Sequence, residues 1–261
     1  MLTNYHTHTK RCHHAAEVPD EDYVISAVKA GFAKLAFTDH VPFPVIPYPE
    51  DQQSRMDYAQ LDEYLASVTA LKVKYQDQIE ILSGFELEFY PAFLDYYREL
   101  KAKTDILIVG QHNPVPLIRD YGIYNRDEDV LLYGRQVTEA IESGIPDIIA
   151  HPDYFLLGRS AWTAACEQAA HQICAASARC QIPLELNLNG LRYGKKLIND
   201  QPAYAYPYPA FWKIASQYQC TAIYGFDAHH PDTLQEFWRI ETVREILEGI
   251  DLKLIDDLNR R

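Results

Sequence analysis

The sequence predicts one α/β domain spanning residues 1–261, in which parallel strands alternate with helices and close into a barrel. Two observations support this fold class. Seven short β-like runs recur at wide intervals along the chain, and the segments between them show helical periodicity with their own start and stop signals. Strands and helices at this spacing are typical of a parallel sheet wound by crossovers, and seven repeats favour a barrel over an open sheet.

The predicted strands and helices can be placed along the chain. The strands cover residues 2–5, 35–39, 79–86, 105–111, 147–151, 182–189 and 220–227. Helices are predicted over residues 19–31, 57–75 and 126–144. The first helix has acidic residues in its first turn, the second carries an apolar stripe, and the first and third end at Gly31 and Gly144. No linker, low-complexity stretch or internal repeat marks a domain boundary in this sequence.

A proline-rich segment follows the second predicted strand. Residues 41–55 contain four prolines, which excludes a helix or a central strand and predicts a long loop. Such a loop could cover an active site as a lid or run over the surface, and the sequence favours neither.

Composition and charge restrict the location and the partners. The chain has no run of eighteen apolar residues and no basic segment followed by an apolar one at its start, so we expect neither a membrane span nor a signal peptide. A cytoplasmic, reducing location follows. The net charge of −13 argues against nucleic acid or an anionic membrane as the main partner. The five cysteines lack paired spacing, so free thiols are favoured, with the role of Cys12 left open.

Residues of the kinds that bind metals end six of the seven predicted strands. They are His6 and His8, Asp39 and His40, Glu86, His112, His151, and Asp227 and His229. The C-terminal ends of parallel barrel strands meet on one face, so these nine residues are expected to converge there. The two histidines of an H-x-H pair point the same way from a strand and can bind one ion. Histidine with carboxylate suits zinc, iron or manganese, and a carboxylate can bridge two ions.

A series of short motifs resembles those of a known family. The motifs HTH, FTDH, GFELEF, GQH, AHPD and FDAHH occur in the order of the PHP (polymerase and histidinol phosphatase) superfamily, from His6 to about Pro231. The segment LELNLNGLRYG and the chain length resemble the histidinol-phosphate phosphatases of that superfamily. The series as a whole is highly specific, whereas no single motif is.

The resemblance implies a distorted (β/α)7 barrel that holds three metal ions at the C-terminal ends of its strands. The implied ligand sets are His6, His8, Glu86 and Asp227 for one ion, Glu86, His112 and His151 for a second, and His14, His40 and His229 for a third. Zinc, iron and manganese all suit such ligands, and the sequence does not choose among them. His14 is preferred to His13 because of its spacing from the first motif. GQH departs from the GSxH expected of the family, which puts the local backbone in doubt.

The resemblance also implies a reaction. The enzyme would hydrolyse L-histidinol phosphate to L-histidinol and phosphate, as in histidine biosynthesis, by in-line attack of a metal-bridging hydroxide on phosphorus. Asp227 and His229 would be the catalytic residues. His230 is either a solvent-facing neighbour or the acid that protonates the leaving group. No protein nucleophile is required, and the chain lacks both GxSxG and the phosphate-binding GxxxxGK[ST] loop.

Arginine is the expected ligand for phosphate oxygens that the metals do not reach. Arg192 lies five residues after Asn187 and inside the family-like GLR motif, so it is the better candidate. Arg159 lies eight residues after His151, and a surface salt bridge is an equal alternative for it.

Other polar and aromatic residues receive weaker expectations. Asp39 and Glu88 are candidates for orienting imidazoles, although a plain salt bridge is equally open for Glu88. His171 is expected to be structural because it lies in the middle of a helix. The loop aromatics Phe43, Tyr48 and Tyr193 are of interest, but packing is the default for each.

Three other functions stay open. A PHP-type phosphoesterase could act on another phosphomonoester, such as a nucleotide or a phosphotyrosine protein. An amidohydrolase-type enzyme that cleaves C–N bonds also favours an early H-x-H, but it usually requires a metal-bridging lysine, and no lysine lies near the C-terminal end of a predicted strand. A third possibility is a barrel that binds metal only for stability in a protein that acts through contacts with a partner. The intact ligand series argues against it, because an inactive domain has no reason to keep open coordination sites. The oligomeric state cannot be read from the sequence.

Overall fold

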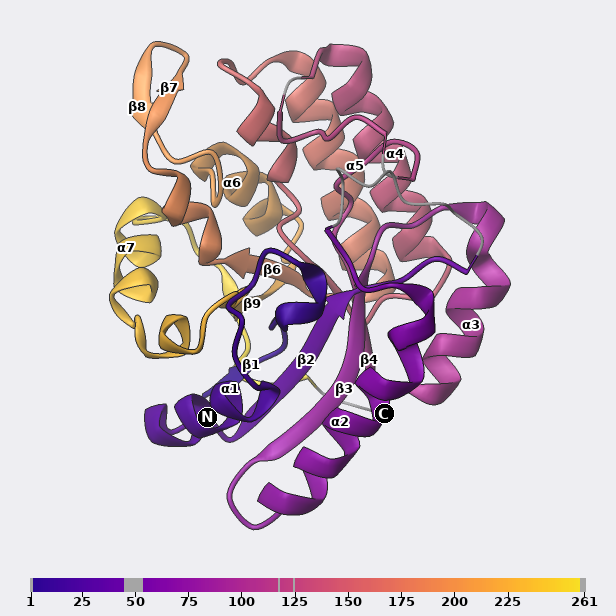
Figure 1. Ribbon diagram of the computed structural model, residues 1–261. Coiled ribbons are helices and arrows are strands. Elements are labelled where there is room, and N and C mark those ends of the chain that lie inside the picture. The colour runs from indigo at the N-terminus through magenta and orange to yellow at the C-terminus, as the bar shows by residue number, and fades with distance from the viewer. Residues whose placement is uncertain (1, 45–53, 117, 124, 259–261) are drawn as a thin grey trace.

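A computed structural model describes residues 2–44, 54–116, 118–123 and 125–258. These residues form an eight-stranded parallel sheet, in the order β1-β2-β3-β4-β5-β6-β9-β10, that curls into a half-barrel (Figure 1). The strands are β1 (Thr3–Asn4), β2 (Lys34–His40), β3 (Glu80–Leu87), β4 (Ile106–Val109), β5 (Ile148–Ile149), β6 (Leu184–Asn187), β9 (Thr221–Gly225) and β10 (Lys253–Leu254). The first seven correspond to the seven predicted strands, so the predicted barrel-type α/β fold is confirmed.

Two features of the sheet structure were not predicted. Strand β10 adds an eighth member beside β9. Strands β7 (Lys196–Ile198) and β8 (Gln201–Ala203) form a separate antiparallel hairpin that projects from the molecule (Figure 1). All three strands have only two or three residues and few buried side chains, so they give no periodic hydrophobic signal in the sequence.

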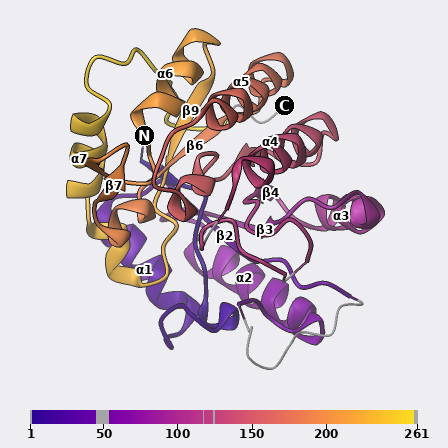
Figure 2. The ribbon, with the colours of Figure 1, turned by 90° about the horizontal axis from the view of Figure 1, so that it is seen from above.

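Helices cover the outside of the sheet (Figure 2). They are α1 (Asp20–Ala30), α2 (Leu61–Tyr75), α3 (Leu94–Lys103), α4 (Asp127–Glu142), α5 (Ala164–Cys180), α6 (Pro209–Gln217) and α7 (Trp238–Ile246). The local signals act as expected in α1, where three acidic residues occupy the first turn and the N–H of Gly31, at φ 83°, bonds to the carbonyls of Ala27 and Val28. The helices predicted over residues 19–31, 57–75 and 126–144 are all present.

Alternation along the strands separates two buried faces. In β3, Ile81 and Phe85 belong to the large core between sheet and helices, whereas Leu82 belongs to a smaller apolar cluster inside the curled sheet. Gly84 and Glu86 share the inner face with Leu82, because alternate residues of a strand point the same way. The inner face is therefore apolar at the N-terminal end of the strands and polar at their C-terminal end.

The two sides of the sheet are joined near its C-terminal end. Thr7 forms a parallel bridge with Ala228, and the Ala228 N–H donates to the carbonyl of His6 at 3.1 Å. Asn4, fully buried, supports this junction: its Nδ2 donates to the His6 carbonyl at 2.9 Å and its Oδ1 accepts from the Phe226 N–H at 2.9 Å. One amide side chain thus connects the first strand of the barrel to the segment after β9.

Several remaining expectations can be checked here. Residues 45–53 of the proline-rich segment, including Tyr48, lie outside the described residues, and so does the choice between lid and surface excursion. Phe43 is buried against Tyr90 and Phe93, which confirms packing as its role. All five cysteines are free thiols. Within the described part of the chain, no helix combines the length and apolar character needed to cross a membrane.

Replacement of Asn4 tests the junction. We expect Asn4→Ala to lower the free energy of unfolding by about 1–3 kcal/mol, because it leaves the buried Phe226 N–H without its acceptor. Urea denaturation followed by circular dichroism measures this, with the exposed Gln78→Ala as a control expected to stay within about 0.5 kcal/mol of wild type. Equal stability of the two variants would show that the junction does not depend on Asn4.

Candidate metal centre

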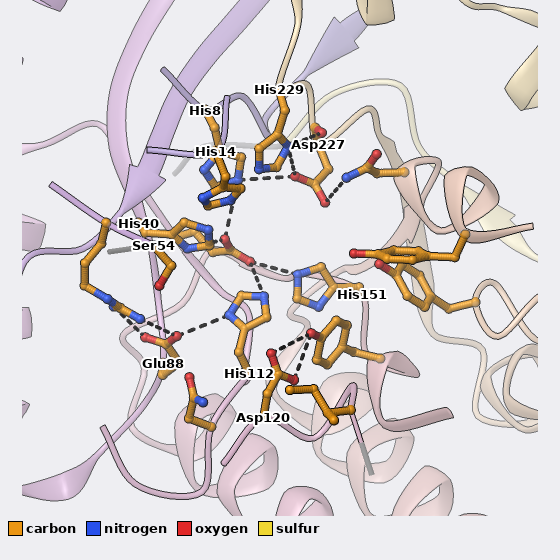
Figure 3. Close-up of a pocket in the computed structure, with 18 of the residues that line it drawn as sticks. His8, His14, His40, Ser54, Glu88, His112, Asp120, His151, Asp227 and His229 are labelled. Atoms are coloured by element: carbon orange, nitrogen blue, oxygen red, sulfur yellow. Dashed lines mark hydrogen bonds and ion pairs between the residues drawn. The ribbon is translucent and has the colours of Figure 1, made fainter. Parts of the chain in front are cut away.

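The predicted ligands lie together at the C-terminal end of the sheet, in a pocket of about 600 Å³ (Figure 3). Eight of the nine predicted ligands line it: His8, His14, His40, Glu86, His112, His151, Asp227 and His229. The ninth, His6, is fully buried directly beneath, with its Nε2 3.0 Å from Nε2 of His8. Residues spread over more than two hundred positions of the chain therefore meet at one place.

Glu86 is the central group of the cluster. Its carboxylate faces five imidazoles, with N–O distances of 3.5 Å to His6, 3.5 Å to His8, 2.9 Å to His40, 3.6 Å to His112 and 2.8 Å to His151. The neighbouring strand leaves room for it, since a Cβ at Gly110 would lie 1.9 Å from Glu86 Oε1. A carboxylate with both oxygens facing several imidazoles has the geometry of a bridging metal ligand.

Asp227 occupies the opposite side of the cluster, with its Oδ1 3.4 Å from His6 Nε2 and 3.2 Å from His8 Nε2. Its other oxygen accepts from the side-chain amides of Asn187 and Asn189, both at 3.2 Å. Asp227 adopts φ 47°, a left-handed conformation that is uncommon for residues other than glycine and that turns the chain sharply after β9. Strained backbone of this kind is frequent at functional sites.

His14, His40 and His229 form a second part of the cluster. Their ligand atoms all lie within 4.8 Å of one another. His13 ends a short helix at φ 62°. Both His13 and His14 are exposed, but the His14 ring lies 4.7 Å from that of His229. The structure thus places His14 rather than His13 beside the other predicted ligands of the third set.

The other groupings follow the predicted sets only in part. His6, His8 and Glu86 lie within 4.8 Å of one another, as three of the four members of the first predicted set. In the second set, Glu86 and His112 group with His40. His151 groups with His6 and Asp227, while its Nε2 also lies 2.8 Å from Glu86 Oε1. The division of ligands among ions therefore stays a prediction.

Four of the imidazoles are oriented by a hydrogen bond at Nδ1. The acceptors are Glu185 Oε1 for His6 at 2.8 Å, the Cys12 carbonyl for His14 at 2.7 Å, Glu88 Oε1 for His112 at 3.2 Å, and the Asp227 carbonyl for His229 at 3.0 Å. A carbonyl or carboxylate only accepts, so each Nδ1 carries a proton, and in the neutral ring Nε2 presents the lone pair. Nε2 of His229 is buried without a hydrogen bond among the described residues. This donor set fits zinc, iron or manganese.

Burial and neighbouring charges shift the pKa values of the cluster in both directions, since burial lowers those of His40 and His229 while carboxylates raise others. Burial lowers the pKa of His6, but Asp227 and other carboxylates outweigh it and hold that pKa well above its usual value. Burial also lowers the pKa of His8, and nearby Asp227 raises it to about 9. For Glu86, burial acts to raise the pKa, yet the surrounding imidazoles keep it well below its usual value. Burial likewise acts to raise the pKa of Asp227, and His6 and other imidazoles keep it well below its usual value, so Glu86 and Asp227 stay ionised and attract cations to the pocket.

Glu185, on the sixth strand, is the main residue that the sequence analysis missed. Besides His6 Nδ1, its carboxylate accepts from the backbone N–H of His151 at 3.0 Å and from Asn187 Nδ2 at 2.9 Å. A Cβ at Gly225, on the adjacent strand, would lie 1.8 Å from its Oε1, so glycine is needed there. The signal was present in the sequence, because a charged residue in the middle of the apolar strand LELN requires a buried partner.

The two acidic residues expected to orient imidazoles have those contacts. Asp39 lies 3.5 Å from Nδ1 of His8, and its Oδ2 accepts from the backbone and the hydroxyl of Thr9. Glu88 contacts His112 and also forms a buried two-bond ion pair with Arg55, at 2.9 Å for each bond. Both alternatives considered for Glu88 are therefore present together.

The two arginines predicted to bind phosphate lie in different places. Arg192 lines the pocket, with its guanidinium 2.9 Å from the Tyr193 hydroxyl. Arg159 does not reach the pocket: the 3-10 helix Tyr154–Gly158 carries the chain away from β5, and Arg159 pairs with Asp127 beside a separate cavity. The prediction that Arg159 binds phosphate is thus corrected in favour of its alternative, a salt bridge.

Two further histidines lie away from the cluster. His230 is exposed and accepts a hydrogen bond from the Asp232 N–H at 3.2 Å, as a cap of the following short helix. His171 contacts the Tyr218 hydroxyl at 3.1 Å on the outer layer of helices. Both positions agree with the structural alternative given for each residue.

The geometry can now be compared with known proteins. The family profile of the PHP domain matches residues 4–189. This chain belongs to the PHP domain family. The match ends before β9, yet Asp227 and His229 lie in the same pocket as the matched residues of this PHP protein.

Relatives cover nearly the whole chain. A Deinococcus radiodurans protein named as a probable histidinol-phosphatase is 28% identical over 259 residues, which cover 94% of this chain and 92% of the relative. A Listeria monocytogenes structure assigned as a histidinol phosphatase has a TM-score of 0.73 and 21% identity, covering 91% of this chain and 99% of its own. Histidinol phosphate phosphatase from Lactococcus lactis, solved with zinc, L-histidinol and phosphate, has a TM-score of 0.70 and 18% identity, covering 97% and 95%. The two structures show the same fold.

Removing the charge of Glu185 tests its support of the cluster. We expect Glu185→Gln to lower the affinity for zinc about 10- to 100-fold, because replacement of a carboxylate that orients a ligating imidazole has effects of this size. Elemental analysis after dialysis against graded zinc concentrations measures it. The surface variant Glu142→Gln, whose carboxylate pairs with Arg179, is the matched control. Identical zinc retention in both variants would exclude the supporting role.

Proposed function

We propose that this PHP protein hydrolyses L-histidinol phosphate to L-histidinol and phosphate, with residues 1–261 acting as one domain. The observation that carries the proposal is the set of five imidazoles facing Glu86 inside a pocket of about 600 Å³. A pocket of this volume suits a small molecule. The histidinol-phosphatase names of the relatives, over most of the chain, support this substrate.

We propose three metal ions, of zinc, iron or manganese, as cofactors. Their ligands would be the nine predicted residues His6, His8, His14, His40, Glu86, His112, His151, Asp227 and His229. When bound, such ions lower the pKa of a coordinated water and offset charge on the phosphoryl oxygens. The chain itself orients His6 through Glu185 and Asp227 through Asn187 and Asn189. Hydrogen bonds at Nδ1 leave Nε2 as the ligand atom of His6, His14, His112 and His229.

Arg192 is the proposed phosphate ligand of the chain, and Asp227 and His229 are the proposed catalytic residues beside it. All three line the same pocket. The planar guanidinium can bind two phosphoryl oxygens at once. No lysine lines the described part of the pocket, which disfavours the amidohydrolase type of centre with a bridging lysine.

A panel of phosphomonoesters tests the substrate. With equal concentrations of histidinol phosphate, a nucleoside monophosphate and phosphotyrosine, we expect kcat/KM to be at least about tenfold higher for histidinol phosphate. A chelator should abolish phosphate release, and zinc, manganese or iron should restore it. A higher kcat/KM for another ester would show that histidinol phosphate is not the preferred substrate. Ammonia release, or the absence of any phosphate release, would show that the protein is not a phosphomonoester hydrolase.

The two arginines provide a matched pair of variants. We expect Arg192→Ala to raise KM for histidinol phosphate at least about tenfold, because charge-assisted hydrogen bonds to phosphate are lost. Arg159→Ala should leave KM near the wild-type value, since its guanidinium pairs with Asp127 outside the pocket. Steady-state kinetics of the metal-loaded variants measures both. A larger change in KM for Arg159→Ala would reverse the assignment.

A further inference from the structure

Four carboxylates line the pocket, and three of them have a partner or a predicted ligand role. Glu86 and Asp227 face the imidazoles, and Glu88 is paired with Arg55. Asp120 is the fourth, and no arginine or lysine pairs with it among the described residues. A carboxylate left without a cation at the wall of a pocket is free to bind a cationic ligand.

Asp120 is held in a defined position on the connection between β4 and α4. The hydroxyl of Tyr154 donates to it, 2.9 Å from Oδ1 and 3.2 Å from Oδ2, and the backbone N–H of Gly122 donates to Oδ1. The adjacent Arg119 does not neutralise it, because its guanidinium pairs with Asp129 on α4 at 2.6 Å. Asp120 lies beside His112 and across the pocket from His229 (Figure 3).

A row of tyrosines connects Asp120 to the proposed phosphate ligand. The ring of Tyr154 lies 5.8 Å from that of Tyr206, which lies 6.1 Å from that of Tyr193. The guanidinium of Arg192 lies 4.8 Å from the centre of the Tyr193 ring. All these residues line the pocket. The wall therefore carries an anion at one end, aromatic rings in the middle and a cation at the other end.

This order of charges matches a phosphomonoester whose organic part is flat and cationic. We propose that Asp120, positioned by Tyr154, binds the cationic nitrogen of the substrate while Arg192 binds its phosphate, which makes Asp120 a specificity-determining residue. The assignment rests on the proposed hydrolysis of histidinol phosphate. The tyrosine faces between the two ends would receive the imidazole ring or the ammonium through stacking and cation–π contacts.

The test is a ratio of two activities of the full-length, metal-loaded protein. We expect Asp120→Asn to lower the ratio of kcat/KM for histidinol phosphate to kcat/KM for phenyl phosphate at least about tenfold, equivalent to about 1.4 kcal/mol. Asparagine keeps the acceptor for Tyr154 and removes the charge. Both activities come from one preparation, so partial misfolding does not change the ratio. Asp127→Asn, which alters a carboxylate outside this pocket, is the control expected to keep the wild-type ratio.

Two simpler esters show which nitrogen is bound. Aminoethyl phosphate carries only the ammonium, and imidazolylethyl phosphate carries only the ring. If Asp120→Asn lowers kcat/KM for aminoethyl phosphate relative to phenyl phosphate, Asp120 binds the ammonium. If it lowers kcat/KM for imidazolylethyl phosphate relative to phenyl phosphate, Asp120 binds the imidazole. Tyr154→Phe should lower the ratio of kcat/KM for histidinol phosphate to kcat/KM for phenyl phosphate less than Asp120→Asn does. In Tyr154→Phe the carboxylate of Asp120 remains and loses only the hydrogen bond from the tyrosine hydroxyl.

The outcomes separate this inference from the proposed function. If the wild-type protein prefers histidinol phosphate to phenyl phosphate and Asp120→Asn keeps that preference, the role of Asp120 is wrong and the proposed function stands. If the wild-type protein shows no such preference, the proposed function and the inference both fall.

Discussion

The carboxylate of Glu86 imposes the constraint on which the rest of the centre depends. It is buried, ionised and faced by five imidazoles, so the charge at this point has to be balanced by protons or by metal ions. Neutral imidazoles alone do not balance it, because Asp39, Glu185 and Asp227 add further buried carboxylates within the same group of contacts. Burial lowers the pKa of His8, but nearby carboxylates raise it to about 9, which agrees with a need for positive charge that bound divalent ions would also meet.

This arrangement reduces the apolar packing on the inner face of the sheet. Toward the C-terminal end, the inner positions of β3 and β6 hold Glu86 and Glu185. Gly110, directly after β4, and Gly225, at the end of β9, leave them the necessary space. Only a small apolar cluster remains at the other end of the curled sheet. Most of the hydrophobic core therefore lies between the strands and the outer helices, where it does not compete with the centre for space.

Features that follow from the order and direction of the strands could be predicted from the sequence, whereas contacts made by loops could not. The seven strands and the convergence of Glu86 with His40 or His112 followed from periodicity, motif order and the shared direction of parallel strands. The position of Arg159 could not be predicted from the sequence, because a short helix turns the chain away from β5 and the guanidinium forms an ion pair with Asp127. Asp120 gave no signal, because its proposed role depends on the lack of an arginine or lysine partner among the described residues and on a hydrogen bond from a tyrosine thirty-four residues away. Contacts of this kind depend on loop conformation rather than on strand order.

The charge distribution also explains how an acidic protein could accept a phosphate ester. A net charge of −13 repels anions, but at physiological ionic strength this field is screened within about 8 Å, so the local charges of the pocket dominate at contact. A substrate with a cationic end loses part of that long-range repulsion, whereas a dianionic ester with a neutral organic part does not. The net negative charge and the proposed role of Asp120 therefore favour the same molecules, those that carry a cation and a phosphate at opposite ends. Selection for the organic part would then begin during approach and be completed in the pocket, independently of the metal ions that act on the phosphate.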